Sequence, residues 1–236
     1  MEPNTHHVVV SSNSYDRIII VGDVHGCLVE LRALLQDLSV TSRDLLIFVG
    51  DIIAKGPMSV ETIREVMALK ALCVRGNHED NLVKSLKDPQ SKHHRSGVYS
   101  FGEELTEQEI QWVTNLPYTI SLPDAGLVIV HAGLVPHLAL EQQKPKDMIR
   151  MRTLDKRGVA SKERASAELT PWAPLYPGPF TVVFGHNAKE GLQVHAFAVG
   201  LDTGCVYGRK LTALVVDKEG RRFVNVKAER VYEERE

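Results

Sequence analysis

The chain has 236 residues, of which 43% are hydrophobic, and its formal net charge is −2. This length and composition favour one large globular domain over two small ones. A net charge so close to zero excludes bulk electrostatic attraction to nucleic acid or to an anionic membrane. We therefore expect a small-molecule partner, with any anionic ligand bound by metals or a few local cations.

The cysteines and the N-terminal residues indicate the compartment. Cys27, Cys73 and Cys205 are widely separated and form no Cys-x-x-Cys pair, which argues against a disulfide framework. The first sixteen residues lack a basic stretch followed by an apolar core, and no apolar run approaches membrane-spanning length. We expect a cytoplasmic protein, with a monomer as the default oligomeric state.

The domain limits follow from composition. We expect a disordered or extended N-terminal segment over residues 1–16, a single domain over residues 17–228 and a charged C-terminal tail over residues 229–236. In the first half of the domain, residues 28–38 and 60–67 carry apolar side chains at helical spacing, each after a strand-like run. This alternation predicts right-handed β-α-β units with parallel strands.

The middle of the chain has a different pattern. Residues 84–105 are polar and predict an insertion that covers one edge of the functional site. Thr106-Glu107-Gln108-Glu109 is a capping box, which predicts the start of a short helix. Two apolar runs at 118–122 and 127–130 flank a turn and predict a β-hairpin.

The last third of the chain predicts a loop followed by strands. Residues 142–179 carry many charges and prolines without an apolar period, so we expect a long irregular segment with one short helix near 162–169. The remaining apolar runs predict strands at 194–201, 211–217 and 222–226.

Six short motifs that contain Asp, Asn or His come directly after strand-like runs. They read Gly22-Asp23-Val24-His25-Gly26, Gly50-Asp51, Gly76-Asn77-His78-Glu79, His131-Ala132-Gly133, Gly185-His186-Asn187 and Asp202-Thr203-Gly204. The ends of buried strands are where an open α/β sheet forms its binding crevice. The motifs therefore predict a cluster of ligands at one edge of the fold.

These residue types are suited to holding two metal ions. Asp51 has two carboxylate oxygens, so it can bridge two ions at the separation of about 3.5–4 Å that is typical of dinuclear hydrolytic sites. A mixed set of oxygen and nitrogen ligands suits Mn, Fe or Zn better than Ca or Mg. We expect two divalent transition-metal ions, with Mn first and Fe, Zn and Co as alternatives. The expected ligands are Asp23 and His25 on one ion, Asp51 between the two, and Asn77, His131 and His186 on the second.

The motifs resemble those of the calcineurin-like metallophosphoesterases in the phosphoprotein-phosphatase superfamily. That group is marked by Gly-Asp-x-His-Gly, Gly-Asp-x-x-x-[Arg/Lys]-Gly and Gly-Asn-His-Glu, and the resemblance extends from Ile18 to about Asp217. It implies an α/β fold, specifically a four-layer α/β/β/α sandwich of two mixed sheets flanked by helices. It also implies the metal roles given above and a role for His78 as the proton donor.

Within the superfamily, three segments resemble the symmetrical diadenosine tetraphosphatases and their eukaryotic relatives. These are residues 50–57, Arg150-Met151-Arg152, and residues 201–214. Protein phosphatases have an Asp where Ala54 stands, and that Asp orients the donor His. A nucleotide phosphate leaves readily without a strong acid, so Ala54 favours phosphoanhydride substrates. Asp80 is a candidate replacement partner for His78.

The expected function is hydrolysis of a phosphoanhydride bond, with diadenosine tetraphosphate cut into two ADP by a metal-bound hydroxide and His78 as general acid. Lys55, Arg150 and Arg152 are candidate ligands of the substrate's phosphate oxygens. Trp172 and Tyr207 are candidates for stacking on a base, although a Trp between prolines more often packs a loop.

Other functions would use the same site. A protein Ser/Thr phosphatase, an endopolyphosphatase or an enzyme acting on capped RNA ends needs the same metal ligands. A non-catalytic scaffold that binds a partner protein is a remote alternative, because scaffold relatives would be expected to lose ligands or the donor, and here all six ligands and His78 are present.

Overall fold

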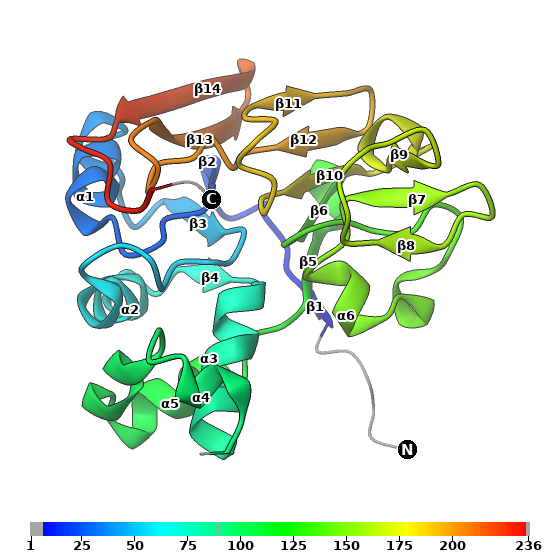
Figure 1. Ribbon diagram of the computed structural model, residues 1–236. Helices are drawn as coiled ribbons and strands as arrows, with labels where there is room; N and C mark the ends of the chain where they lie inside the picture. The colour runs from blue at the N-terminus through cyan, green and yellow to red at the C-terminus, as the bar shows by residue number, and fades with distance from the viewer. Residues whose placement is uncertain (1–6, 89, 235–236) are drawn as a thin grey trace.

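The computed structural model describes residues 7–88 and 90–234 and contains two mixed sheets that stack face to face (Figure 1). The five-stranded sheet has the order β14 (Gly220–Lys227), β13 (Lys210–Asp217), β2 (Arg17–Val21), β3 (Asp44–Phe48) and β4 (Leu72–Cys73). The six-stranded sheet has the order β1 (His7–Val9), β5 (Thr119–Leu122), β6 (Leu127–Val130), β10 (Thr181–Phe184), β12 (Ala198–Gly200) and β11 (Gln193–Val194).

The first half of the chain forms the predicted β-α-β units. Strands β2, β3 and β4 are parallel neighbours, and they are linked by α1 (Leu28–Asp37) and α2 (Ser59–Ala68). The leucines spaced along α1 are buried against one face of the five-stranded sheet. Strands buried on both faces read as continuous apolar runs, which is why β2 is Arg-Ile-Ile-Ile-Val.

Alternation along the strands builds two separate cores. Ile19 and Val21 of β2 face the helices, whereas Ile18 and Ile20 face the six-stranded sheet. Side chains alternate across a strand, so a single strand supplies both layers. In the core between the sheets, these residues meet Ile129 of β6 and other aliphatic side chains.

The outer face of the six-stranded sheet is covered by the charged, proline-rich segment. Here lie α6 (Pro145–Met148), the 3₁₀ turns η3 (Leu140–Gln142) and η4 (Ala173–Leu175), and a small antiparallel sheet of β8 (Ala160–Ser161), β7 (Thr153–Asp155) and β9 (Leu169–Pro171). With α1 and α2 on the opposite side, this gives the expected four-layer sandwich. Trp172 is the largest buried side chain of this outer layer.

The helix predicted near residues 162–169 is wrong. The backbone carbonyls of Lys162 and Glu163 accept hydrogen bonds from the side chains of Arg152 and Thr153, at 2.9 Å each, and so do not serve a helix. The run also lacks an apolar face, because its residues are almost all exposed. The strand predicted over residues 194–201 is a short hairpin instead, with β11 and β12 joined by a tight turn.

The polar insertion forms a helical layer below the five-stranded sheet in Figure 1. Residues 84–105 contain the end of α3 (Asn77–Lys87), α4 (Lys92–Arg95) and the 3₁₀ turn η1 (Ser100–Glu104), and α5 (Glu107–Thr114) follows directly. The predicted capping box is confirmed. Thr106 Oγ1 accepts a hydrogen bond from the Glu109 amide, and the Glu109 carboxylate accepts one from the Thr106 amide. The predicted hairpin is confirmed as β5 and β6, joined through η2 (Pro123–Ala125).

Both ends of the described chain are attached to the domain. Strand β1 pairs with β5, within the segment that was expected to be disordered or extended. In the C-terminal tail, the Tyr232 hydroxyl donates to Glu30 Oε1 at 2.8 Å, which brings Glu233 and Glu234 to the wall of the main cavity. No helix in the described residues is long and apolar enough to cross a membrane.

The two sheets approach each other closely at Gly22, directly after β2. A Cβ atom added there would overlap the carbonyl oxygen of Leu201, which follows β12. We predict that Gly22→Ala lowers the free energy of unfolding by about 1–3 kcal/mol, because backbone atoms must separate. Urea unfolding measures the change. Gly102→Ala is the matched control, because its added Cβ would meet the flexible side chains of Leu82 and Leu86 rather than backbone. Equal losses in the two variants would contradict the prediction.

Candidate metal centre

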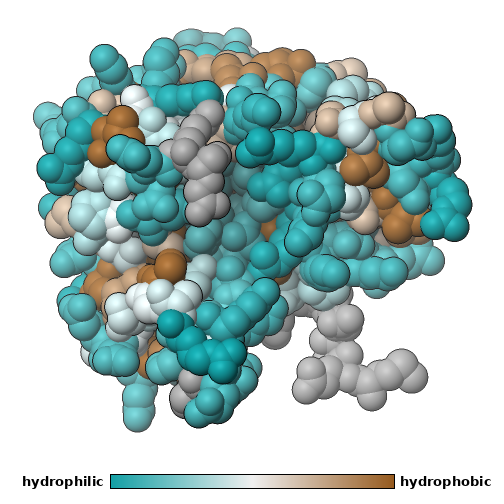
Figure 2. Space-filling view, viewed as in Figure 1, coloured by the Kyte–Doolittle hydropathy of each residue, from teal (hydrophilic) through white to brown (hydrophobic). Residues whose placement is uncertain are grey.

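The predicted motif residues gather around one cavity. Its volume is about 640 Å³, and it lies where the carboxyl ends of β2, β3, β6, β10 and β12 converge. Figure 2 shows a hydrophilic hollow near the middle of this face. The predicted site residues that line the cavity are His25, Asp51, Lys55, Asn77, His78, Arg152 and His186, while His131 is fully buried behind them. Segments far apart in the sequence thus meet at one site.

Asp51 lies at the centre of the cluster and is held by the loop around it. Its backbone amide and that of Ile52 donate to the Glu79 carboxylate at 2.9 Å, and Gly76 donates at 2.8 Å. Asp51 Oδ1 in turn accepts from the His78 amide at 2.8 Å. A side chain at Gly76 would overlap both carboxylates. Glu79 therefore joins the β3 loop to the start of α3.

Burial, followed by the nearby charge of Asp51, raises the pKa of Glu79 to about 7. Burial alone would also raise the pKa of Asp51. The surrounding imidazoles of His131, His78 and His25 outweigh that effect and hold the Asp51 pKa well below its usual range. Asp51 is thus an ionised carboxylate among nitrogen donors.

Each of the three predicted histidine ligands has one ring nitrogen bound to a backbone carbonyl. His25 Nδ1 lies 3.0 Å from the Ile53 oxygen, His131 Nδ1 lies 2.8 Å from the Val49 oxygen, and His186 Nε2 lies 3.2 Å from the Arg150 oxygen. A carbonyl only accepts, so these nitrogens carry the hydrogen and the other nitrogen of a neutral ring has a free lone pair. Metal-binding histidines are oriented in this way.

The second ring nitrogens of His25 and His131 lie close to the Asp51 carboxylate. Asp51 Oδ2 lies 3.4 Å from His131 Nε2 and 3.8 Å from His25 Nε2, and His131 Nε2 lies 3.3 Å from Asn77 Oδ1. Two groups share this carboxylate, with ligand atoms within 4.8 Å of one another: His25, Asp51 and His78, and Asp51, His131 and His186. Burial alone would lower the pKa of His131, but Asp51 raises it, so positive charge is favoured between these groups. A proton or a metal cation can supply that charge. The donor set therefore fits two metal ions bridged by Asp51.

Asp23 lies beside this cluster without facing the cavity. Its carboxylate accepts from the His186 amide at 3.1 and 3.2 Å, and a Cβ at Gly185 would overlap it. It thereby positions the loop that carries His186, and its ligand role stays a prediction. Asp202 lines the cavity at 4% exposure. The sequence marked the Asp202 motif but gave it no role.

The predicted cations take different positions. Lys55 Nζ lies 3.1 Å from His25 Nε2 and 5.3 Å from the centre of the Tyr207 ring. Burial alone would lower the pKa of Lys55, but Asp51 and other neighbours raise it, so Lys55 stays charged. Arg152 lines the cavity, whereas Arg150 binds Asn81 Oδ1 at 2.6 Å and does not line it. The exposed Arg164 does line it, and no sequence signal distinguished it from other loop charges.

His78 has a partner that the sequence did not reveal. The Tyr99 hydroxyl lies 2.9 Å from His78 Nδ1, and Tyr99 Oη accepts from Asn81 Nδ2 at 3.0 Å. Since Tyr99 already accepts from Asn81, we infer that it donates its own proton to Nδ1, which would place the ring hydrogen of His78 on Nε2. Burial lowers the pKa of His78 to about 4, so the ring is neutral near pH 7.

Asp80 is not the partner of His78, and that prediction was wrong. Its carboxylate pairs with Lys84 at 2.6 Å and lies 3.7 Å from Arg150. Tyr99 comes from the polar insertion, where a lone Tyr carries no recognisable motif. The sequence did predict that this insertion covers one edge of the site.

The sequence between residues 16 and 215 matches the family model for calcineurin-like phosphoesterases. The chain belongs to this family. It is therefore a phosphoester hydrolase, and the family uses divalent metal ions, which the ligand geometry fits.

Relatives of known name differ in where they cut. The symmetrical bis(5'-nucleosyl)-tetraphosphatase of Janthinobacterium sp. (strain Marseille) is 30% identical, over 82% of this chain and 90% of its own. The asymmetrical bis(5'-nucleosyl)-tetraphosphatase PrpE of Anoxybacillus flavithermus is 31% identical, over 83% of this chain and 88% of its own. Sequence similarity alone thus does not decide the position of cleavage.

Solved structures agree with the fold. A crystal structure assigned provisionally as a diadenosine tetraphosphatase aligns with a TM-score of 0.84 and 33% identity, over 95% of this chain and 98% of that one. A protein serine/threonine phosphatase from Saccharomyces cerevisiae aligns with a TM-score of 0.62 and 17% identity, over 97% and 84%. The second likeness concerns the fold alone.

We predict that Tyr99→Phe lowers kcat about tenfold or more on a phosphomonoester with a poor leaving group, such as phenyl phosphate, with little change in bound metal. The reason is that His78 loses the group that fixes its orientation and its tautomer. Steady-state kinetics and elemental analysis test this. Tyr15→Phe, at a surface tyrosine away from the cavity, is the control. An unchanged kcat would show that Tyr99 does not position His78.

Proposed function

We propose that this protein hydrolyses dinucleoside polyphosphates and that it cuts diadenosine tetraphosphate into two ADP. The observation that carries the proposal is the pairing of His78 with Tyr99 in place of a carboxylate. A carboxylate would stabilise a charged imidazolium, which is a strong acid for a poor leaving group. A phenol that donates to Nδ1 keeps the ring neutral, and this suffices for a nucleotide phosphate that leaves readily.

The relatives support this substrate class. The symmetrical and asymmetrical enzymes named above, each about 30% identical over most of their length, are both called bis(5'-nucleosyl)-tetraphosphatases. Ala54, which stands where protein phosphatases have an orienting Asp, is 2% exposed and lies on the loop after Asp51. The loop thus offers no carboxylate at position 54 that could replace the Tyr99 contact.

The chain's own residues would divide the work at the cavity. Asp23, His25, Asp51, Asn77, His131 and His186 would hold two divalent ions, with Mn proposed first and Fe, Zn and Co as alternatives. When bound, such ions supply Lewis acidity and lower the pKa of a coordinated water. Lys55 and Arg152 would bind non-bridging phosphate oxygens from the cavity wall, and the Nε2–H group of His78 would donate a hydrogen bond to the leaving oxygen.

Charge favours cleavage in the middle of the tetraphosphate. The cavity is lined by Lys55, Arg152 and Arg164 in addition to the metal ligands. The interior of a phosphate chain offers these cations the most oxygens at once, so attack on an inner phosphorus is favoured over attack on an outer one. Two ADP follow if the other inner phosphate leaves with its nucleoside.

The bridging role of Asp51 has a direct test. We predict that Asp51→Asn lowers hydrolysis about 100-fold or more and reduces bound metal, because both ions share this carboxylate. Elemental analysis of purified protein measures the metal. Asp37→Asn, at an exposed position on α1, should change neither quantity. Two equivalents of metal and near-normal activity in Asp51→Asn would exclude a bridging carboxylate.

The product pattern tests the proposed cleavage. Metal-loaded protein with diadenosine tetraphosphate should give ADP as the only nucleotide product at early times, as resolved by chromatography. AMP and ATP in equal amounts would show that the bond between an outer and an inner phosphate is cleaved, which is asymmetrical cleavage, the term in the name of the PrpE relative. Parallel reactions with long-chain polyphosphate and a phosphopeptide complete the test, since faster turnover of either would replace the proposed substrate.

A further inference from the structure

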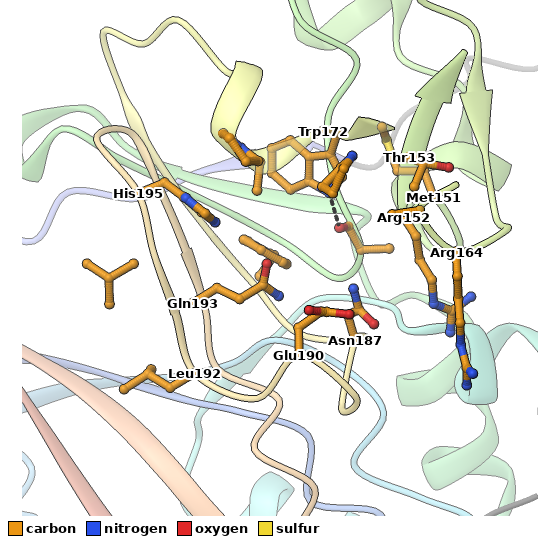
Figure 3. Close-up of a pocket in the computed structure, with 17 residues that line it drawn as sticks. Met151, Arg152, Thr153, Arg164, Trp172, Asn187, Glu190, Leu192, Gln193 and His195 are labelled. Atoms are coloured by element: carbon orange, nitrogen blue, oxygen red, sulfur yellow. Dashed lines mark hydrogen bonds between the residues drawn. The ribbon is translucent and has the colours of Figure 1, made fainter. Parts of the chain in front are cut away.

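A second pocket lies beside the metal-site cavity. Its volume is about 340 Å³, within the range of about 300–1,000 Å³ of small-molecule sites. Arg152, Arg164 and Asn187 line both spaces. Figure 3 shows Arg152 and Arg164 next to each other at one end of the second pocket. The two spaces therefore meet at a pair of guanidinium groups.

The second pocket has an apolar wall held rigidly in place. The indole nitrogen of Trp172 donates to the Ala132 carbonyl at 3.1 Å, and the Trp172 and Phe184 rings pack with centroids 4.9 Å apart. Met151 and Leu192 extend this wall. The small sheet of β7, β8 and β9 and the β10–β12 region supply these residues, so the wall belongs to two layers of the fold. Such a surface suits a flat, uncharged ring.

Polar groups without partners point into the same pocket. His195 Nε2 is buried and has no hydrogen-bond partner among the described residues. The side-chain amide of Gln193 makes no hydrogen bond in the described part of the chain. Figure 3 shows the side chains of Gln193 and His195 directed toward the interior of the pocket. The Gln193 side-chain amide can therefore pair with a ligand that enters the pocket, whereas the shielded His195 nitrogen cannot. A primary amide both donates and accepts, as the edge of a purine base requires.

The charged residues that line the two cavities indicate that each cavity suits a different part of a ligand. The metal-site cavity contains the metal ligands and the cations Lys55 and Lys189, with Glu233 and Glu234 on its wall. Among the described residues, the second pocket has lysine or arginine cations only at Arg152 and Arg164, where the two spaces meet, and it carries the acidic Glu190 on its own wall. Glu190 repels a phosphate that would enter the second pocket. A neutral group attached to a phosphate chain satisfies both spaces, because the chain can pass the guanidinium pair while the neutral end enters.

We propose that the second pocket binds one purine nucleoside of the substrate, with the side-chain amide of Gln193 contacting the edge of the base. This inference rests on the proposed function for its ligand, a dinucleoside polyphosphate. Arg152 and Arg164 bind the phosphates that connect the nucleoside to the metal centre. The pocket therefore supplies affinity for the nucleoside part of the substrate and none for a bare phosphate chain.

The kinetic test introduces a bulky side chain at the rim of the pocket. Ala165 and Ala167 are both exposed in the same loop, and only Ala165 lines the pocket. Ala165→Trp should raise KM for diadenosine tetraphosphate about tenfold or more, leave KM for inorganic tripolyphosphate within twofold, and leave kcat on tripolyphosphate unchanged. Ala167→Trp should behave as the wild type. If Ala165→Trp changed both substrates equally or neither, the nucleoside assignment would be overturned.

A binding test without catalysis uses adenosine alone as the probe. The chain has two tryptophans, Trp112 and Trp172, and only Trp172 lines the pocket. Adenosine added to ¹⁵N-labelled holoprotein should shift the indole signal of Trp172 and leave that of Trp112 in place. Gln193→Ala should weaken the interaction about three- to tenfold, the loss expected for a neutral hydrogen bond. Shifts at Trp112 alone, or no shift at either, would overturn the proposal.

The two tests separate this inference from the proposed function. If diadenosine tetraphosphate is not hydrolysed but adenosine shifts Trp172, the pocket stands and the substrate assignment fails. If the tetraphosphate is hydrolysed to ADP but Ala165→Trp and Gln193→Ala leave its KM unchanged, the proposed function stands and the pocket assignment fails.

Discussion

The buried carboxylate of Asp51 is the group around which the site is organised. It is ionised at 2% exposure, a state that costs free energy unless cations or hydrogen-bond donors surround it. Here the donors come from the α3 amide of His78, and the neighbouring imidazole nitrogens have no hydrogen to offer when neutral. The protein alone thus supplies few hydrogen-bond donors to Asp51. The same arrangement suits a set of ligands for two cations.

Glu79 explains how such a cluster can be held rigidly. Its carboxylate accepts three backbone amides, from Asp51, Ile52 and Gly76, in a fully buried position. These bonds fix the β3 loop against the start of α3, so Asp51, Asn77 and His78 keep their relative positions before any ion binds. Preorganised ligands of this kind lose little conformational freedom on metal binding.

Stacking of two sheets brings the remaining ligands into range. β2 and β3 deliver His25 and Asp51 from one sheet, and β6 and β10 deliver His131 and His186 from the other. Close approach at Gly22 and Gly185 leaves room for backbone and carboxylate atoms only. The same outer layer that covers the six-stranded sheet also forms the wall of the second pocket, so one packing arrangement positions both the phosphates and the proposed nucleoside.

The amino-acid sequence by itself determined the β-α-β units, the β5–β6 hairpin and the cluster of metal-ligand motifs. Each of these depends on local patterns: apolar periodicity for α1, a continuous apolar run for β2, and a short motif directly after a strand. The capping box at Thr106 was likewise readable because it involves residues only three apart.

Only the tertiary structure decided the partners that come from distant segments. Tyr99 reaches His78 across 21 residues, and Trp172, Gln193 and His195 form one pocket from separate strands and loops. The segment near Lys162 lost its predicted helix because side chains of Arg152 and Thr153 take its carbonyls. Such contacts depend on how layers pack, and a single polar residue in a loop carries no period or spacing from which that packing can be inferred.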